Sequence, residues 1–462
     1  MRRRHQATLG GYVQASEVIA LCREYSLFEW GTQEVNPLPI DRGEGCYLYT
    51  MDGRQILDFN SIAMNVNIGH GDSRVTEAVT KQMEKVSFVS PFMVTEVRAE
   101  VAKKIAEVTP PGLTKSFFTL AGSDANEAAV RTARLVTGKK KILSRYRSYH
   151  GATHQVLALG GDPRREPVEA GMGDIVRIPD PYHYRFPWIT DEKEFCKFNL
   201  EQIKQIIQLE GPHTIAAVIV EPITGSNGLI IPPQGWLSGL QDLCKQNEIL
   251  LICDEVMSGF GRTGDWFAVN HEGVTPDIMT LAKGITSGYL PLGACVVSDQ
   301  IADAIHDRPL GSGLTYQSHP VALAAASATI PIYETDGLIE HSRDMGNYLL
   351  EGLADLASRH ACVGDVRGSG LFTAMELVYD QETRLELFPL TGPASEADQQ
   401  MRKVFADEGL ACVLRGPYLF ANPPLIVERE QIDWALSIFD RALDIADSAT
   451  ASAGAPLPSH SQ

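Results

Sequence analysis

Lys283 is the residue of this chain with the clearest potential for covalent chemistry. It follows the apolar run 278–282 and is succeeded at once by Gly284 and a hydroxyl-rich turn, a pattern typical of a strand that ends at a cleft. A lysine amine forms Schiff bases with aldehydes, and removal from water favours its neutral, nucleophilic form. An isolated lysine, however, is far more often a solvated surface charge. The prediction that Lys283 is a nucleophile therefore depends on its neighbours.

A candidate phosphate site lies at the turn formed by Gly122 and Ser123. The turn follows the apolar run 116–120 and opens a segment with helical character. A helix N-terminus presents free N–H groups and the positive end of the helix dipole, which suits an anion. The ordinary alternative is that Ser123 only caps the helix. Gly122 would let a ligand approach the backbone closely.

Two carboxylates stand at the ends of other apolar runs. Glu221 follows residues 215–220, and Asp254 follows residues 249–253. A carboxylate in such a place is costly unless it is paired, and its partner can be a main-chain turn, a metal ion or a protonated ring nitrogen. A metal is the less favoured partner, because no ligand-like histidine accompanies this pair.

These groups together match the requirements of pyridoxal phosphate. That cofactor needs a phosphate cradle, a lysine for its aldehyde, and an acid that keeps its pyridine nitrogen protonated. The sequence supplies Gly122 with Ser123, Asp254 and Lys283, each at the end of an apolar run. Tyr149, which stands two residues before a glycine, could stack on a flat ring. We therefore predict one cleft that holds this cofactor.

The elements that would position these residues alternate between strand and helix. From residue 95 onward, short apolar runs are separated by segments of helical period. Such alternation is typical of an α/β fold with a mostly parallel sheet flanked by helices. Ligands in such folds bind beyond the carboxyl ends of the strands, where the nominated residues stand. The predicted strands are residues 116–120, 141–144, 215–220, 249–253 and 278–282.

The length of 462 residues exceeds what one hydrophobic core usually supports. We predict a large domain over residues 95–335 and a small α+β domain made from both chain ends, residues 25–94 and 336–446. Residues 1–24 would form an N-terminal tail. Residues 447–462, rich in Ala, Ser and Pro, are predicted to be disordered.

Local patterns add further expectations outside the large domain. An Asp52-Gly53 pair between alternating residues predicts a hairpin, and a helix is expected over residues 73–86 with Ser73 as its cap. Residues 319–356 have continuous helical character, and residues 363–377 are expected to form a strand entered through a glycine-rich turn.

Composition excludes several classes of function. Asp and Glu outnumber Lys and Arg by 58 to 40, a net charge of −18, which argues against nucleic acid or an anionic membrane as the principal partner. No apolar run approaches the roughly 20 residues of a membrane span. The eight cysteines show no C-x-x-C pair, so we expect neither a zinc site nor a disulfide framework, and a cytoplasmic location fits best.

Five motifs occur in order along the chain and share one resemblance. They resemble the class III aminotransferases, which are fold type I pyridoxal phosphate enzymes, and the similarity covers roughly residues 25–446. The motifs are residues 121–127, 149–151, 254–264, 282–284 and 313–320.

The resemblance implies a role for each matching residue. Lys283 would hold the cofactor as an internal aldimine and move a proton between the substrate carbon and the cofactor. Asp254 would pair with the pyridine nitrogen, and Tyr149 and Val256 would pack on opposite ring faces. The full set of implied cofactor-binding residues is Gly122, Ser123, Tyr149, His150, Glu221, Asp254, Val256, Lys283 and Thr315.

The resemblance also implies assembly. In this family the hydroxyl that matches Thr315 reaches the phosphate of the neighbouring subunit, so a homodimer, or a dimer of dimers, is expected. Residues 286–293 would form a loop close to the dimer interface.

Other positions bear on the substrate. The ornithine and GABA enzymes of the family carry a glutamate at the position of Ser226, where it neutralises a substrate-binding arginine, so this departure puts those two activities in doubt. Arg415 matches an arginine that binds the α-carboxylate of the keto acid and swings away for other substrates, a task that suits a bidentate guanidinium. Its ordinary alternative is a surface arginine in a loop.

Two stretches, residues 59–70 and 145–165, look most like the branch that contains taurine transaminases. Within them Met64 replaces the tryptophan of many amine-preferring relatives, and Arg164 is a candidate ligand for a distal sulfonate or carboxylate. Trp30 lies in an aromatic segment that could line the pocket or merely anchor the chain.

Three functions remain open at this point. The first is a transaminase that moves an amino group from an ω-amino acid, taurine or a primary amine to pyruvate or 2-oxoglutarate by a ping-pong mechanism. The second is a lyase or aminomutase on the same fold, because a carbanion formed beside Lys283 can also eliminate a substituent. The third, a catalytically inactive binding protein, is disfavoured by the presence of both Lys283 and Asp254.

Overall fold

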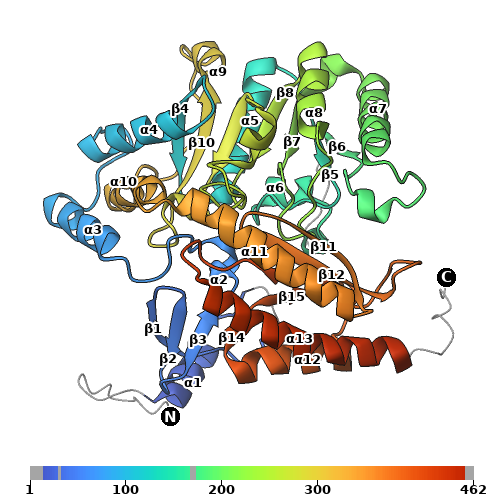
Figure 1. The fold of residues 1–462 in the computed structure, drawn as a ribbon. Helices are drawn as coiled ribbons and strands as arrows, with labels where there is room; N and C mark the ends of the chain where they lie inside the picture. Colours follow the sequence, from blue (N-terminus) through green and yellow to red (C-terminus); the bar gives the residue numbers. More distant parts are fainter. Residues whose placement is uncertain (1–13, 30–32, 167–172, 453–462) are drawn as a thin grey trace, which may run out of the picture.

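The computed structural model describes residues 14–29, 33–166 and 173–452. Figure 1 shows a large upper body of sheet and helices above a smaller lower body that contains both chain ends. Trp30, one of the predicted substrate residues, lies outside the described residues. In the described part of the chain, no helix is long and apolar enough to span a membrane.

A seven-stranded sheet forms the centre of the large body. Its strand order is β4-β10-β9-β8-β7-β5-β6, and every neighbouring pair is parallel except those that β10 makes with β4 and β9. The predicted α/β fold with a mostly parallel sheet is therefore confirmed. The strands are β4 (Leu113–Thr119), β5 (Lys141–Arg145), β6 (Ile175–Ile178), β7 (Ile215–Val220), β8 (Leu250–Asp254), β9 (Ile278–Leu281) and β10 (Gly293–Ser298).

Helices cover both faces of this sheet because its strands are apolar on both sides. Along β7, Ala217 and Ile219 enter a core with helix α5, whereas Val218 and Val220 enter a second core with helices on the other face. Successive side chains of a strand point to opposite faces, which explains this division. The helices of the large body are α4 (Glu96–Val108), α5 (Gly122–Thr137), α6 (His154–Leu159), α7 (Glu192–Glu210), α8 (Trp236–Gln246), α9 (Asp299–Ala304) and α10 (Pro320–Thr335).

The small body joins the two ends of the chain in one sheet. Strand β14 pairs in parallel with β3, so residues near 410 lie beside residues near 57. This sheet contains β1 (Ile40–Glu44), β2 (Tyr47–Thr50), β3 (Gln55–Asp58) and β14 (Leu410–Ala411), and the predicted hairpin at Asp52-Gly53 is its β2–β3 pair. The N-terminal helices of this body are α1 (Ala15–Tyr25) and α2 (Ser61–Met64), whereas α3 (Ser73–Lys85) packs against α10 of the large body (Figure 1).

A second small sheet carries the C-terminal part. Its path is β11-β12-β16-β15, with β13 paired to β12. Its strands are β11 (Val363–Ser369), β12 (Phe372–Asp380), β13 (Leu385–Glu386), β15 (Val413–Arg415) and β16 (Tyr418–Ala421). The flanking helices are α11 (Leu338–Arg359), α12 (Glu396–Glu408) and α13 (Arg429–Ser452).

The structure differs from the predicted secondary structure in several segments. The helix predicted over residues 319–356 is broken into α10 and α11, because Gly337 adopts the left-handed region at φ 64°. The strand predicted over residues 363–377 is two antiparallel strands that turn at Gly370, with φ 55°. Strands β6 and β10 were not predicted, and β10 begins inside the expected loop 286–293.

Two helix ends also differ from expectation. The cap of α3 is Asp72, whose side chain accepts the Arg74 amide, rather than Ser73. Helix α13 continues to Ser452, so the prediction of disorder is wrong for residues 447–452. Asp447 explains the continuation, since its carboxylate lies 2.7 Å from Nδ1 of His360 and accepts the Cys362 amide at 2.8 Å.

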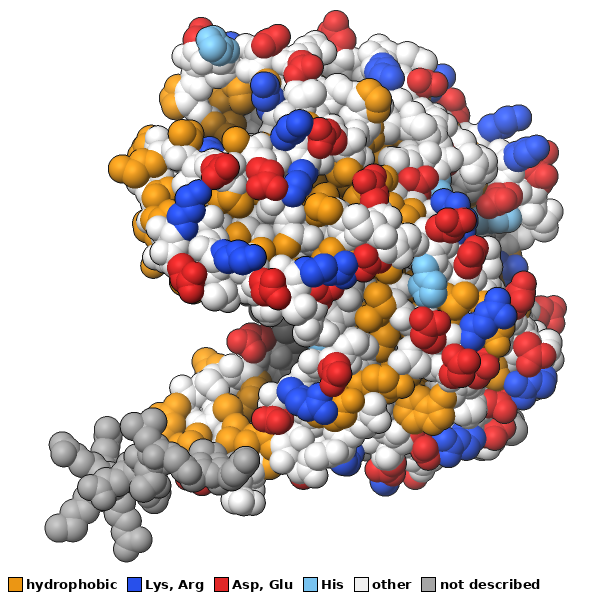
Figure 2. Space-filling view, turned by 60° about the vertical axis from the view of Figure 1, so that its left-hand side comes forward, with side chains coloured by type: hydrophobic (Ala, Val, Ile, Leu, Met, Phe, Trp, Pro, Cys, Tyr) orange, Lys and Arg blue, Asp and Glu red, His pale blue; other side chains and the backbone are white. Residues whose placement is uncertain are grey.

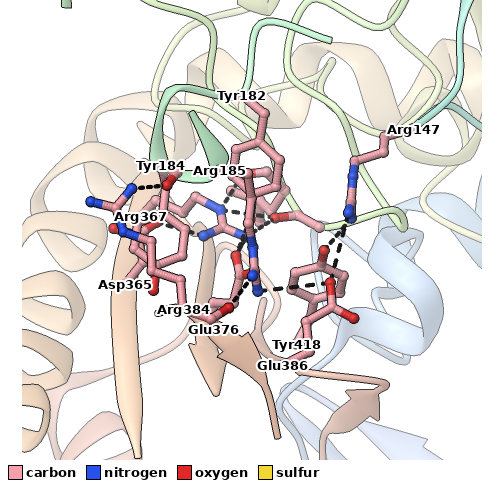
Figure 3. Close-up of polar contacts among 12 residues, drawn as sticks. Arg147, Tyr182, Tyr184, Arg185, Asp365, Arg367, Glu376, Arg384, Glu386 and Tyr418 are labelled. Carbon is pink, nitrogen blue, oxygen red and sulfur yellow. Dashed lines mark hydrogen bonds and ion pairs between the residues drawn. The ribbon is translucent and has the colours of Figure 1, made fainter. Parts of the chain in front are cut away.

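A buried polar network fastens the small body to the large one (Figure 3). Its centre is Glu376 of β12, a fully buried carboxylate. Glu376 accepts hydrogen bonds from Tyr182 and Arg185, which precede α7, and pairs with Arg367 of β11 at 2.8 Å. Because one carboxylate serves three donors from two parts of the fold, this network fixes how the C-terminal sheet sits against the parallel sheet.

Candidate active site

A cavity of about 620 Å³ lies beyond the carboxyl ends of the parallel strands, where ligands bind in α/β folds. It collects most of the residues nominated from the sequence. Thr315 is exposed and does not line it. The nominated residues that line the cavity are Met64, Gly122, Ser123, Tyr149, His150, Arg164, Glu221, Asp254, Val256, Lys283 and Arg415.

Asp254 is a buried carboxylate at the end of β8 with a full set of partners. Its Oδ2 atom lies 2.8 Å from Nδ1 of His150 and accepts the side-chain amide of Asn126 at 2.7 Å. Its Oδ1 atom accepts the Val256 amide at 3.0 Å. These contacts fix the plane of the carboxylate at the cavity wall, which is what pairing with a ring nitrogen requires.

Asn126 is a functional residue that sequence reasoning missed. It lies on α5, fully buried, and bonds Asp254, the His150 carbonyl at 2.7 Å and, through its own oxygen, the Thr280 hydroxyl at 2.7 Å. Asn126 belongs to the motif 121–127, but nothing in its local sequence indicated that α5 would bring its side chain into contact with Asp254 at the end of β8. Asn126 therefore holds the Asp254 carboxylate in position through this hydrogen bond.

Lys283 lies at the end of β9, partly buried and facing the cavity. Burial lowers the pKa of its amine to about 8, although the charges of Asp254 and Glu221 oppose this effect. Its backbone adopts the left-handed region at φ 47°, an unfavourable conformation for a residue with a side chain. A substantial neutral fraction of the amine is thus available near neutral pH, as a nucleophile needs.

The N-terminus of α5 opens onto the cavity without a cap. The N-cap is Ala121, which forms no side-chain cap bond, and Ser123 lies inside the first turn. The alternative that Ser123 merely caps the helix is therefore wrong. Its hydroxyl accepts the Ala152 amide at 3.1 Å. A Cβ at Gly122 would lie 2.8 Å from Cγ1 of Val256, so only glycine fits between this helix end and the cavity wall.

Glu221 orients the loop that carries the aromatic ring of the site. Its Oε1 atom accepts the Tyr149 amide at 3.0 Å and its Oε2 atom accepts the Gly225 amide at 2.8 Å. Burial raises the pKa of this carboxyl. Its partners are main-chain amides, one of the alternatives open from the sequence.

Arg164 and Arg415 approach the same buried carboxylate at one side of the cavity. Arg164 grips Asp162 through Nε and Nη2, both at 2.7 Å, and Arg415 reaches the same carboxylate through Nη2 at 2.7 Å. The Arg164 guanidinium also lies 4.0 Å from the centroid of the Tyr149 ring. The alternative that Arg415 is an ordinary surface residue is wrong, and Asp162, which no expectation had singled out, joins the two.

Met64 reaches the cavity from an unusual turn. All four residues of α2 have positive φ, between 44° and 62°, although none is glycine. The turn is held by Ser61, whose hydroxyl accepts from Arg262 at 2.9 Å and donates to the Asn422 carbonyl at 2.6 Å. Backbone strain of this kind persists only where surrounding contacts enforce it, and it often marks a binding site.

The assembled residues fit pyridoxal phosphate. The uncapped α5 N-terminus suits the phosphate, the fixed Asp254 carboxylate suits a protonated ring nitrogen, and the Lys283 amine suits the aldehyde. Tyr149 and Val256 both line the space between them. Among the described residues, no group of three or more His, Cys, Asp or Glu side chains could hold a metal ion.

Comparison with known proteins agrees with this geometry. Residues 30–443 match the family Aminotransferase class-III. The chain is 35% identical, over 88% of its own length and 90% of the relative, to a putrescine–pyruvate aminotransferase of Pseudomonas aeruginosa.

Solved structures give the same result. A taurine:2-oxoglutarate aminotransferase from Bifidobacterium kashiwanohense, in complex with PLP and glutamate, is similar with a TM-score of 0.91 and 36% identity, covering 94% of this chain and 99% of that one. An (S)-enantioselective ω-transaminase from Thermomicrobium roseum is similar with a TM-score of 0.89 and 34% identity, with the same coverage. These findings support transamination over the lyase or aminomutase alternative. The chain therefore belongs to the class III aminotransferases and is a pyridoxal-phosphate-dependent transaminase of fold type I.

Proposed function

We propose that this transaminase takes its amino group from an ω-amino acid, taurine or a primary amine and passes it to pyruvate or 2-oxoglutarate. The observation that carries the proposal is the pair Arg164 and Arg415, which lines the same cavity as Lys283. Such guanidinium groups suit a carboxylate or sulfonate at one end of a substrate whose amine lies at the other. The named activities of the putrescine and taurine relatives lend further support.

The chemistry divides between the cofactor and this chain. When bound, pyridoxal phosphate supplies the aldehyde and the electron-withdrawing ring. Lys283, with its lowered pKa, would take the proton from the substrate carbon and deliver it to the cofactor, and the reverse transfer would serve the second half of the ping-pong exchange, so both halves use one base. Asp254 holds positive charge at the ring nitrogen, and His150 and Asn126 keep that carboxylate in place.

Ser226 bears on which ω-amino acids are used. It lines the cavity where the resemblance places a glutamate in the ornithine and GABA enzymes, and a serine supplies no charge to neutralise Arg415. We therefore expect taurine and β-alanine to be better donors than ornithine or GABA.

A donor panel tests the proposal. The purified holoenzyme is offered taurine, β-alanine, putrescine, GABA and 1-phenylethylamine with pyruvate or 2-oxoglutarate, and both new amino acid and free ammonia are measured. Formation of alanine or glutamate in step with donor loss supports the proposal. Stoichiometric ammonia would support elimination instead, and failure of every donor would refute the proposed substrate classes.

We further propose that the protein acts as a homodimer. Exposed apolar side chains lie in the segment between α3 and α4, where residues 92–94 are all exposed, and Figure 2 shows hydrophobic side chains at the left edge of this side of the molecule. Phe92 is 100% exposed and Val94 is 85% exposed. The ring centroids of Phe88 and Tyr316 lie 5.6 Å apart, so the segment before α4 lies beside the segment that contains Thr315. A patch of this kind on a folded chain is typical of a protein interface.

In the proposed dimer, Thr315 would contact the cofactor of the partner subunit, a role that a single chain cannot provide. Its side chain is exposed and lies away from the cavity of its own chain, as expected if it serves the cofactor phosphate of a partner. Light scattering on the holoenzyme should give twice the chain mass, and Phe92→Asp with Val94→Asp should give monomers with weakened cofactor binding. A monomeric, fully active wild-type protein would contradict this assembly.

We propose a cytoplasmic location. Its support is that all eight cysteines are free thiols, seven of them buried or partly buried, as is usual in a reducing compartment. Fractionation of cells that produce the protein at native level tests the location.

A further inference from the structure

Asp162 lies at the centre of a charged cluster that the proposed function leaves unexplained. The residue is 2% exposed, and its carboxylate accepts four hydrogen bonds: two from the Arg164 side chain, one from the Arg164 amide at 3.0 Å and one from Arg415. Burial alone would raise the pKa of Asp162, but the hydrogen bond from Arg164 and the charge of Arg415 hold it well below its usual range. The carboxylate is therefore ionised at any pH at which the enzyme works.

The cluster has a defined net charge. Within the described part of the chain, the guanidinium groups of Arg164 and Arg415 and the carboxylate of Asp162 sum to one positive charge. Because the cluster is largely buried, that charge is weakly screened and acts strongly on a substrate a few ångströms away. One acidic group of a substrate would bring the sum to zero, whereas a substrate without an acidic group would leave it at one.

The bonding pattern of Arg415 leaves room for such a group. Both of its hydrogen bonds, to Asp162 and to Asn227 at 3.3 Å, come from Nη2. Nε and Nη1 therefore have no hydrogen-bond partner among the described residues. The Ser226 hydroxyl lines the same cavity and is buried without a hydrogen-bond partner within the described part of the chain.

The cluster also joins separate parts of the fold. Arg164 lies in a short 3-10 helix of the large body (Pro163–Arg165) that Asp162 caps, and Arg415 ends strand β15 of the C-terminal sheet. The carboxylate thus holds Arg415 at the cavity wall from across the cleft. Without it, two like charges would face each other with no group between them.

We propose that Asp162 sets the charge preference of the substrate cavity. By neutralising one of two arginines and holding Arg415 to the wall, it lets the cavity bind a single carboxylate or sulfonate and still admit a donor that lacks one. Asp162 is a positioning residue, since it acts through Arg415 and Arg164. This inference rests on the proposed function, because it concerns how that function's substrates are distinguished.

The test compares an anionic donor with an uncharged one. Asp162→Asn keeps the shape and one acceptor oxygen but removes the negative charge, so the net charge of the cluster of residues 162, 164 and 415 rises from one to two. Single-turnover amino transfer to the bound cofactor is measured with taurine and with 1-phenylethylamine for wild type and variant. We expect the ratio of kcat/KM for taurine to that for 1-phenylethylamine to rise at least about tenfold, as one unit charge at this range allows.

A binding measurement provides a readout that does not depend on turnover. Isethionate has the sulfonate of taurine but no amine, so it probes the anion subsite alone. Its dissociation constant, measured by calorimetry on the holoenzyme, should fall several-fold in Asp162→Asn. Asp162→Glu restores the charge and should return both the ratio and the dissociation constant toward wild type.

The control is an Asp–Arg pair outside the cavity. Asp365 pairs with Arg367 at 2.5 Å in the network of Figure 3, and Asp365→Asn should leave the ratio and isethionate binding unchanged. Equal losses for both donors in Asp162→Asn, a ratio that shifts toward 1-phenylethylamine, or wild-type protein that uses taurine but transfers nothing from 1-phenylethylamine would each overturn the proposal. A wild-type enzyme that uses neither donor contradicts the proposed function instead, and isethionate binding would then decide the role of Asp162 separately.

Discussion

Nδ1 of His150 lies 2.8 Å from Oδ2 of Asp254, and the side chains of both residues are buried against the cavity. This contact engages one oxygen of the carboxylate, and the side-chain amide of Asn126 donates to the same oxygen at 2.7 Å. The carboxylate consequently keeps one orientation before any ligand arrives. This preorganisation is the feature on which the proposed chemistry depends.

Replacing the carboxylate of Asp254 should separate cofactor binding from catalysis. Asp254→Asn can keep much of the hydrogen-bond geometry but cannot hold a proton on the ring nitrogen, so amino transfer should slow at least about a hundredfold. Stopped-flow absorbance with cofactor content measured in parallel provides the test. Asp277→Asn is the control, because Asp277 accepts the Leu251 amide at the opposite end of β8. A rate within threefold of wild type would show that Asp254 is not the ring partner.

The close fit of Gly122 predicts a specific loss of cofactor affinity. In Gly122→Ala the new methyl group would lie 2.8 Å from Val256 and displace the start of α5, where the phosphate should bind. The dissociation constant of pyridoxal phosphate should rise at least tenfold in equilibrium titrations of the apoenzyme. Gly173→Ala, where an added Cβ meets nothing within 4 Å, should behave as wild type. Unchanged affinity in Gly122→Ala would place the phosphate elsewhere.

Glu255 should make stability depend on pH near neutrality. Burial raises the pKa of Glu255 to about 7, above its ordinary 4.5. Between these values the folded state keeps a proton that the unfolded state releases, so the free energy of unfolding falls as pH rises from about 4.5 to about 7. Glu255→Gln removes the titrating carboxyl and with it this pH dependence of the free energy of unfolding.

Urea unfolding of apoenzyme at pH 5 and pH 8 measures the effect of Glu255. The stability of Glu255→Gln relative to wild type should increase between the two pH values by up to about 3 kcal/mol. Glu107→Gln on the surface of α4 serves as the control. A difference that stays constant with pH would mean that Glu255 does not titrate in this range.

Glu376 should be among the most costly residues to remove. Glu376→Ala would leave the partly buried Arg185 and Arg367 without their shared carboxylate, and removing one partner of a buried ion pair typically destabilises a protein by about 3–5 kcal/mol. Glu408→Ala breaks a solvent-exposed pair with Arg441 and should leave the free energy of unfolding nearly unchanged. Denaturant unfolding compares the two, and equal effects would rule out a special role for the network.

Much of the site could be predicted because its residues stand where local pattern is strong. Gly122, Asp254 and Lys283 each follow a run of apolar residues, and parallel strands bring their carboxyl ends to one edge. Each of these residues could therefore be recognised from its neighbours in the sequence, although the site itself combines residues from distant parts of the chain. The predicted strands at 215–220 and 249–253 agree with β7 and β8 to within one residue.

The remainder depends on contacts between distant parts of the chain. Asp162 meets Arg415 across 253 positions, and Asn126 meets Asp254 across 128, so neither pairing leaves a trace in the local sequence. The left-handed turn of α2 is equally hidden, because it contains no glycine and is imposed by Arg262 and other tertiary contacts. Such features follow from the assembled fold alone.

The central claim is that Lys283 is the residue that joins covalently to pyridoxal phosphate, and one measurement tests it directly. Holoenzyme is reduced with borohydride, digested, and analysed by mass spectrometry for peptides that carry the reduced cofactor. The structure predicts a single modified residue, Lys283, and no modified peptide together with loss of the visible absorbance in Lys283→Ala. Modification of another lysine in the wild-type protein, or visible absorbance that persists in Lys283→Ala, would contradict the claim.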